Sequence, residues 1–235
     1  MALAVLALAA FGALLLYGHA RGHPQDMPWT ALDLSQPIGL FTGRKLADLA
    51  GEGPRCQALL TRAGVRHTAL PPRSEGAQCG HDDAVRFDVG GSRAIAYRPD
   101  GLGTSCAVAA ALALWEWHVV QPAARRHFGR GVTAIDHFGS YNCRRLYGRD
   151  EGAWSEHARA NAVDIAGFVL DDGTRISLIG DWRDEGERGR FLHEVRDGAC
   201  DLFATVLSPD YNEAHRDHLH FDQAQRGALG WRACR

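Results

Sequence analysis

The stretch EAHRDHLHFD, residues 213–222, places three histidines within six positions near the end of the chain. Burying an unpaired imidazole is costly, and rings this close repel one another once they are protonated. The last five residues alternate as a β-strand does, which predicts that His218 and His220 share one face while the apolar residues next to them face the core. Two imidazoles on one strand face supply only part of a metal site, so other ligands must come from elsewhere.

The candidate partners lie upstream in SEHARANAVDIAGF, residues 155–168. His157 and Asp164 are seven positions apart, and Asp164 stands between two apolar residues of an expected strand. A carboxylate there is costly unless it is paired, hydrogen-bonded or bound to a metal. Imidazole nitrogen and carboxylate oxygen are both common zinc ligands, and three protein ligands leave the fourth position open to water. The sequence therefore predicts a catalytic type of zinc site from His157, Asp164 and one of the clustered histidines.

Composition excludes one class of partner and favours an ordinary folded domain. The chain has 235 residues, 46% of them hydrophobic, which is enough for a core of one domain. Its formal net charge is −2, without the basic excess that is typical of nucleic-acid-binding proteins. We therefore expect no nucleic-acid partner.

The N-terminus predicts export. The first seventeen residues carry no charged side chain, and this run has two interpretations: a signal peptide cut after Ala20, or an N-terminal membrane anchor if it is left uncleaved. Residues 21–43 contain three prolines and are expected to form a linker. The predicted organisation is a signal peptide or anchor over residues 1–20, this linker, and one globular domain over residues 44–235.

Cysteine usage agrees with export. The number is even, the cysteines are widely spaced, and there is no C-x-x-C pair, a pattern typical of disulfides rather than of a zinc ribbon. Six cysteines allow 15 pairings, and the sequence does not choose among them. The six are Cys56, Cys79, Cys106, Cys143, Cys200 and Cys234.

Hydrophobic periodicity predicts an α+β fold, with helices beside a small antiparallel sheet stapled by disulfides. The expected helices cover residues 45–64 with a break at Gly53-Pro54, 105–129 with a kink at Pro122, and 185–203. The expected strands lie within residues 132–141, 161–170, 175–180, 205–209 and 218–222, with a hairpin over 84–99 that turns at two adjacent glycines.

The spacing of these motifs resembles that of a known group of enzymes. S-x-H-x-x-x-x-A-x-D followed by H-x-H is similar to the pattern of the lysostaphin and D-Ala-D-Ala metallopeptidase group, whose fold hedgehog signalling domains share. More closely, GSYNCRR, SEHARANAVDIAGF and FATVLSPDYNEAHRDHLHFD resemble the bacterial extensin-like C-terminal domain family, over about residues 45–225. The resemblance implies a D-Ala-D-Ala metallopeptidase or hedgehog-like fold. Ala160 departs from the peptidase pattern, which has glycine there, and a different loop backbone is therefore possible.

The resemblance also implies roles for individual residues. His157, Asp164 and His220 would bind Zn²⁺. His218, on the same strand face, would act as the general base or steady the tetrahedral intermediate. Asp217 stands where some relatives have a catalytic glutamate, and it would act on the water or only orient an imidazole.

For two further candidate site residues, His215 and Arg144, the sequence leaves a second interpretation open. His215 would support the metal site from outside the ligand set, although taken alone it is interpreted as a surface residue next to a loop. Arg144 resembles the arginine that meets a substrate carboxylate or oxyanion in related peptidases, and Arg145 competes with it for this role.

The function that the resemblance implies is zinc-dependent hydrolysis of peptide bonds in peptidoglycan, of the carboxypeptidase or endopeptidase kind. The expected location is the bacterial periplasm or cell envelope, either secreted or anchored to the inner membrane. The alternative is a non-catalytic envelope protein that keeps the zinc site for ligand binding or stability. The two hypotheses share the metal ligands and differ in whether a working base exists.

Overall fold

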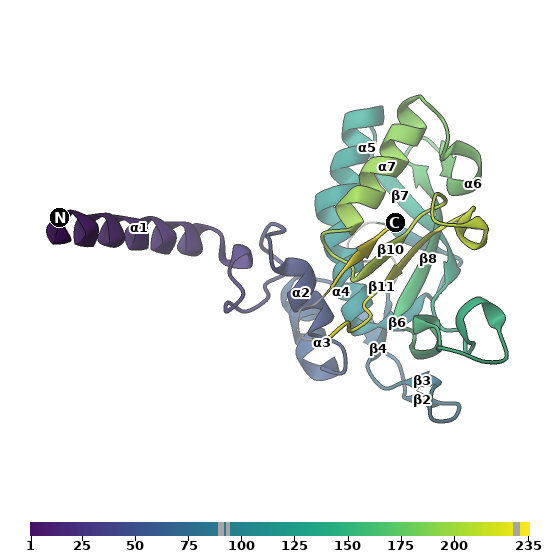
Figure 1. Ribbon diagram of the computed structural model, residues 1–235. Helices are drawn as coiled ribbons and strands as arrows, with labels where there is room; N and C mark the ends of the chain where they lie inside the picture. Colours follow the sequence, from purple (N-terminus) through teal and green to yellow (C-terminus); the bar gives the residue numbers. More distant parts are fainter. Residues whose placement is uncertain (89–91, 93–94, 228–230) are drawn as a thin grey trace.

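The computed structural model describes residues 1–88, 92, 95–227 and 231–235, and it is a mixed α+β structure (Figure 1). The α-helices are α1 (Ala2–Gly22), α2 (Thr42–Ala47), α3 (Gly53–Arg62), α4 (Cys106–Trp115), α5 (Gln121–Phe128), α6 (Leu178–Asp181) and α7 (Glu187–Ala199). The shorter turns are η1 (Pro24–Asp26), the π-helical η2 (Glu116–Val120), η3 (Leu146–Gly148), η4 (Glu156–Arg159) and η5 (Glu213–His215).

The main sheet of the described chain has seven strands, in the order β12-β10-β11-β8-β7-β5, with β9 added to β8. Its strands are β5 (Ala96–Arg98), β7 (Val132–Gly139), β8 (Ala162–Leu170), β9 (Arg175–Ser177), β10 (Thr205–Leu207), β11 (Leu219–Asp222) and β12 (Ala233–Cys234). The prediction of an antiparallel sheet is right for the central strands. It is wrong at both edges, where β5 pairs with β7 and β12 with β10 in parallel.

Two smaller sheets lie beside it. One consists of β1 (His67–Ala69), β4 (Ala84–Phe87) and β6 (Gly103–Ser105), the other of β2 (Arg73–Ser74) and β3 (Gly80–His81). The expected hairpin over residues 84–99 is wrong, because β4 pairs with β1 and β6 while β5 joins the main sheet. Its two glycines lie outside the described residues. The expected strand over 175–180 ends at Ser177, whose hydroxyl accepts from Gly180 N and starts α6.

Helices α4, α5 and α7 cover one face of the main sheet (Figure 1). All ten residues of α4 are buried, and Ser105 caps the helix by accepting from Val108 N. Trp115 packs against Phe168 and Phe221 and donates to Val195 O at 2.8 Å, so it ties the helices to the sheet. The chain continues from α4 into α5 through the wide turn η2, which lets Pro122 sit in the first turn of α5.

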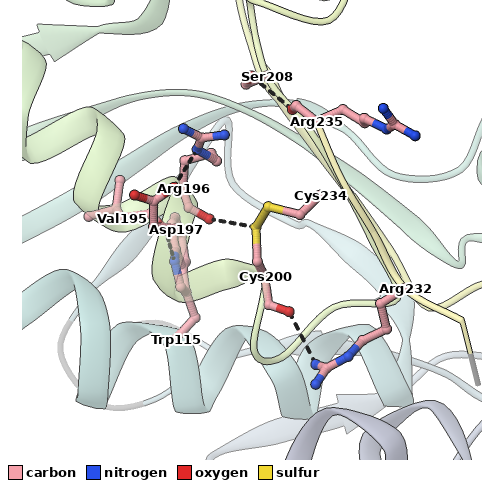
Figure 2. Close-up of a disulfide and its surroundings, with 9 residues drawn as sticks. All are labelled: Trp115, Val195, Arg196, Asp197, Cys200, Ser208, Arg232, Cys234 and Arg235. Atoms are coloured by element: carbon pink, nitrogen blue, oxygen red, sulfur yellow. Dashed lines mark hydrogen bonds and ion pairs between the residues drawn. A yellow bond between two sulfur atoms is a disulfide. The ribbon is translucent and has the colours of Figure 1, made fainter.

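All six cysteines form disulfides: Cys56–Cys106, Cys79–Cys143 and Cys200–Cys234. The first links α3 to α4, and the second links the β2–β3 unit to the loop after β7. The third links the end of α7 to the C-terminal strand β12 (Figure 2). Each closes a loop of tens of residues and by the chain-entropy relation stabilises the fold by about 4 kcal/mol. The predicted disulfides are confirmed.

The expected linker is partly folded. Leu32 and Leu34 belong to the hydrophobic core, and Met27 is also buried. These apolar side chains are spaced among the prolines, and burying them favours a folded loop over a flexible tether. This part of the expected linker is therefore packed against the domain that follows it. Helix α1 has no buried residue and extends beyond the apolar run to Gly22.

Candidate metal centre

Two neighbouring strands bring the predicted ligands together. Strands β8 and β11 are antiparallel, and their register places His220 directly opposite Asp164. Leu219 and Phe221 are fully buried in the core, so the even positions of β11 face the other side of the sheet. The alternation in HLHFD therefore works as the sequence predicts.

The third predicted ligand, His157, comes from the loop before β8. Ser155 accepts a hydrogen bond from His157 N and begins η4, which Ala160 ends with a left-handed backbone at φ 53°. The Ala160 carbonyl accepts from Ser105 N, Thr104 Oγ1 and Ser140 Oγ, at 2.7, 2.9 and 3.1 Å. Alanine here adopts the conformation for which glycine is suited, so the loop keeps the bend despite the departure from the glycine pattern.

Three ligand atoms lie at the vertices of a small triangle. His157 Nε2 is 3.2 Å from Asp164 Oδ1 and 3.2 Å from His220 Nδ1, and the last two atoms are 2.9 Å apart. Two ligand atoms on a tetrahedral zinc ion lie about 3.3 Å from each other. Among the described residues these three form the only group of metal-ligating side chains that is this close.

The outer nitrogens of both imidazoles are already bound. His157 Nδ1 donates to Ser140 O at 2.5 Å, and His220 Nε2 donates to Asp222 Oδ2 at 3.2 Å. In their neutral tautomers, both rings then direct a lone pair at Asp164 Oδ1. Three electron pairs that converge at a buried point repel one another unless a cation or a proton lies between them. Carboxylate or carbonyl partners on the outer nitrogen are typical of metal-binding histidines.

The pKa values follow from this arrangement. Burial acts to raise the pKa of the Asp164 carboxyl, but hydrogen bonds and charge from His157 and His220 outweigh it and hold the pKa well below the ordinary value. Burial acts to lower the pKa of His220, yet Asp164 and Asp222 raise it to about 9. The metal-free centre therefore keeps a proton at neutral pH. The donor set and its spacing both fit zinc.

His218 lies at the edge of the triangle and not in it. Its Nε2 is 3.5 Å from Asp164 Oδ1, and its Nδ1 donates to Asp217 Oδ1 at 2.9 Å. About 12% of the His218 side chain is exposed, compared with 5% of the His157 side chain. The structure thus pairs Asp217 with an imidazole, which leaves Nε2 pointing toward the metal position.

His215 is buried, with 9% of its surface exposed, so the interpretation as a surface residue is wrong. Sequence spacing alone does not reveal that η5 turns the ring inward, to within 5.2 Å of the His218 ring centroid. Its Nδ1 donates to Asn212 Oδ1 at 2.7 Å. Burial and the two neighbouring histidines lower the pKa of His215 to about 4, so the ring is neutral at physiological pH.

The structure separates the two candidate arginines. Arg145 donates to Gly152 O, and its guanidinium stacks on Trp154 at 4.6 Å. The buried Nε of Arg144 has no hydrogen-bond partner among the described residues, and its charge contributes to lowering the pKa of His215. Arg144 is therefore the arginine beside the histidine cluster.

Three residues that contact the histidines of the centre were not identified from the sequence. Asp222 and Ser140 fix the tautomers of the two ligand histidines, and Asn212 holds His215. Asp222 was detectable, because it follows His220 by two positions and shares its strand face. Ser140 acts through its backbone carbonyl, and nothing in its side chain signals that role.

Comparison with known proteins identifies one family. No curated protein and no solved structure matches this chain. A family model described as Extensin-like protein C-terminus matches residues 54–235, which include every residue of the candidate centre. The match covers well over half of the sequence, and the chain belongs to the extensin-like C-terminal family.

Proposed function

We propose that this protein is a zinc-dependent hydrolase of the bacterial cell envelope that cleaves peptide bonds in peptidoglycan. The observation that carries the proposal is the convergence of His157 Nε2, Asp164 Oδ1 and His220 Nδ1 within 3.2 Å of one another. Three protein ligands leave a fourth position for water or substrate, as in catalytic zinc sites. The similarity of the motifs to the D-Ala-D-Ala metallopeptidase group supports peptide as the substrate.

The residues around the triangle supply the other parts of such a reaction. Zinc bound here would lower the pKa of a coordinated water and polarise the scissile carbonyl. His218 Nε2 would accept the proton of the nucleophile, since Asp217 on Nδ1 fixes the tautomer that leaves Nε2 unprotonated. His218 would then return this proton to the leaving amine.

Arg144 is suited to an anionic group of the substrate. Its buried Nε is unpaired among the described residues, and a planar guanidinium binds a carboxylate through two parallel hydrogen bonds. A carboxylate next to the scissile bond, or the oxyanion that forms during attack, fits this description. Arg145 is already engaged with Trp154 and would contribute to loop structure only.

Zinc content and peptidoglycan cleavage, measured on the same samples, test the proposal. We expect one zinc per chain and release of muropeptides by the wild type. His218→Ala should keep the zinc and lose at least about 100-fold in rate, the usual contribution of a general base. His67→Ala changes a histidine of β1 outside the centre and should match the wild type.

Two results would contradict this function in different ways. Full zinc with no cleavage of any peptidoglycan by the wild type would favour the non-catalytic zinc-binding protein. Absence of stoichiometric zinc would remove both hypotheses.

A further inference from the structure

The segment that follows α1 is closed into a compact loop. Phe41 N donates to Gln25 O at 3.0 Å, and Leu40 N donates to Asp26 Oδ1 at 2.8 Å. Lys45, the only lysine of the chain, is buried. Its Nζ donates to three oxygens of this loop: Pro24 O, Gln25 Oε1 and Thr30 Oγ1. Helix α1 therefore leaves the domain from a fixed point beside α2 (Figure 1).

Large apolar side chains are exposed on this side of the domain. Trp29 and Leu40 of the closed loop are 70% and 73% exposed, and Trp231 of the C-terminal segment is 70% exposed. Tryptophan prefers the boundary between water and lipid, because its ring is apolar and its N–H is polar. Exposed apolar side chains gathered next to a long apolar helix mark an interaction surface.

A basic cleft of about 380 Å³ lies between α2 and the C-terminal segment. Arg44, Arg226 and Arg232 line it together with Trp231, and Asp48 is the one acidic residue among the described lining residues. We call the set Trp29, Leu40, Arg44, Arg226, Trp231 and Arg232 the collar.

The two arginines of the C-terminal segment are held in place by neutral groups. Arg232 donates to Cys200 O at 3.1 Å (Figure 2), and Arg226 donates to Ala204 O and Thr205 Oγ1 at 3.1 and 2.6 Å. Within the described part of the chain, neither guanidinium forms an ion pair with a carboxylate. The Cys200–Cys234 disulfide fixes the strand that follows Arg232. Arg226 also interacts electrostatically with the Glu156 carboxyl, but neither charge is paired directly with a carboxylate among the described residues, so the cleft is suited to an anion such as a phosphate.

We propose that the collar rests on the surface of a bilayer that contains anionic phospholipids, with lipid phosphate in the arginine cleft and Trp29, Leu40 and Trp231 at the headgroup level. Helix α1 has 21 residues and so is about 30 Å long, enough to span the hydrocarbon core of that bilayer. In this arrangement the chain keeps α1 as an anchor and lies directly on the membrane.

The orientation that follows matters for the metal centre. The teal-green loop between β7 and β8, which carries η3 and η4, lies on the side of the domain opposite α1 (Figure 1). A collar seated on the membrane would thus turn the metal-bearing loop away from the lipid. The collar does not depend on the zinc chemistry, since it shares no residue with the centre.

Tryptophan quenching in nanodiscs tests the contact, using the full chain with α1 inserted. Brominated phosphatidylglycerol should quench the wild type, and the Trp29→Phe/Trp231→Phe double variant should lose more than half of that quenching. Trp154→Phe, a half-buried tryptophan of the loop far from α1, is the matched control and should keep it. Quenching that is absent, or that the double variant retains in full, would overturn the proposal.

The lipid charge tests the cleft separately. Quenching should be stronger with brominated phosphatidylglycerol than with brominated phosphatidylcholine, and added NaCl at a concentration of about 0.5 M should reduce the difference. Arg232→Gln should reduce it as well, and the wild type in high salt provides the same comparison if that variant does not fold. Equal quenching by both lipids at low salt would overturn the role of the arginines.

Discussion

Among the buried carboxylates of the described chain, Asp164 and Glu116 have opposite surroundings and opposite pKa shifts. Asp164 is enclosed by His157 and His220, and its pKa is held well below the ordinary value despite burial. Glu116, in the turn between α4 and α5, is 1% exposed and bonded to the hydroxyls of Ser92 and Tyr97. Burial is the main reason that the pKa of Glu116 rises to about 8.

The difference shows what distinguishes a cation site from a structural hydrogen bond. Hydroxyl groups bring no charge, so a buried carboxylate among them takes up a proton. Imidazoles whose outer nitrogens are bound elsewhere present lone pairs, so the carboxylate among them needs a cation. The neighbours, and not the degree of burial, decide whether a buried acid can hold a metal.

The largest effect is expected when each of the two acids is neutralised in turn. Asp164→Asn removes a ligand and its charge, and should reduce zinc from one ion per chain to none after dialysis. Glu116→Gln should keep the full zinc content, because the amide that it introduces is neutral, like the protonated acid that it replaces. Zinc would be measured by mass spectrometry on dialysed protein whose fold has been verified by circular dichroism.

Zinc retained in full by Asp164→Asn would mean that the metal binds elsewhere. Zinc lost from a folded Glu116→Gln would mean that the two regions are linked through the core, and the contrast between them would fail.

The local structure around the candidate metal centre could be predicted from the sequence. Alternation in HLHFD predicted the face of β11 on which His220 lies, and the acid between Val163 and Ile165 marked Asp164 as a candidate, whereas the register that sets the two opposite each other is a contact between distant segments. Local periodicity decides such a face, so no knowledge of the tertiary structure was needed. The cap at Ser105 and the break before α3 follow from local signals in the same way.

Contacts between distant segments were not predictable. The parallel edges at β5 and β12 depend on how the chain returns to the sheet, and the pairing of Cys200 with Cys234 depends on the same return. His215 was misplaced because its burial follows from a turn and not from a periodic pattern. The environment of Glu116 has no local signal either, since its hydroxyl partners lie 19 and 24 positions away.

The next largest effect concerns the pH dependence of unfolding. The folded chain keeps the proton of Glu116 up to about pH 8, while the unfolded chain releases it near the ordinary pKa of 4.5. The folded state thus binds more protons between these values, and stability from this group is lost as the pH rises through that window. The slope is about 1.4 kcal/mol per pH unit at most.

Urea unfolding of zinc-free wild type and Glu116→Gln, between about pH 5 and 8.5, measures this contribution. His220, whose pKa is raised to about 9, also favours the folded state less as the pH rises, and it acts equally in both proteins. The difference between them therefore isolates Glu116. Parallel curves would show that the acid is ionised in the folded chain.

A smaller effect is expected from the outer partner of His220. Asp222→Asn keeps the size of the side chain but weakens the bond to His220 Nε2, and should lower zinc affinity by about 10–100-fold. Asp217→Asn is the matched control, since Asp217 contacts His218 and none of the three ligands through the hydrogen bonds of the described residues. Competition with a chelator would measure the zinc affinity of both variants. Equal affinities for Asp222→Asn and Asp217→Asn would mean that Asp222 does not support the metal site.

The smallest expected effect concerns the backbone conformation at Glu116 and at Ala160, the residue that ends the loop before β8. Glu116 has a right-handed backbone, whereas Ala160 at the metal loop is left-handed, which costs an alanine about 1–2 kcal/mol. Ala160→Gly relieves that strain but removes a buried methyl worth about 0.8 kcal/mol and adds a backbone-entropy cost of about 0.5–1 kcal/mol, so the gain and the losses nearly cancel. Ala158→Gly loses a buried methyl without any strain to relieve and should destabilise the chain by about 1–2 kcal/mol. Urea unfolding of both variants compares them, and equal destabilisation would mean that the left-handed bend at Ala160 carries no strain.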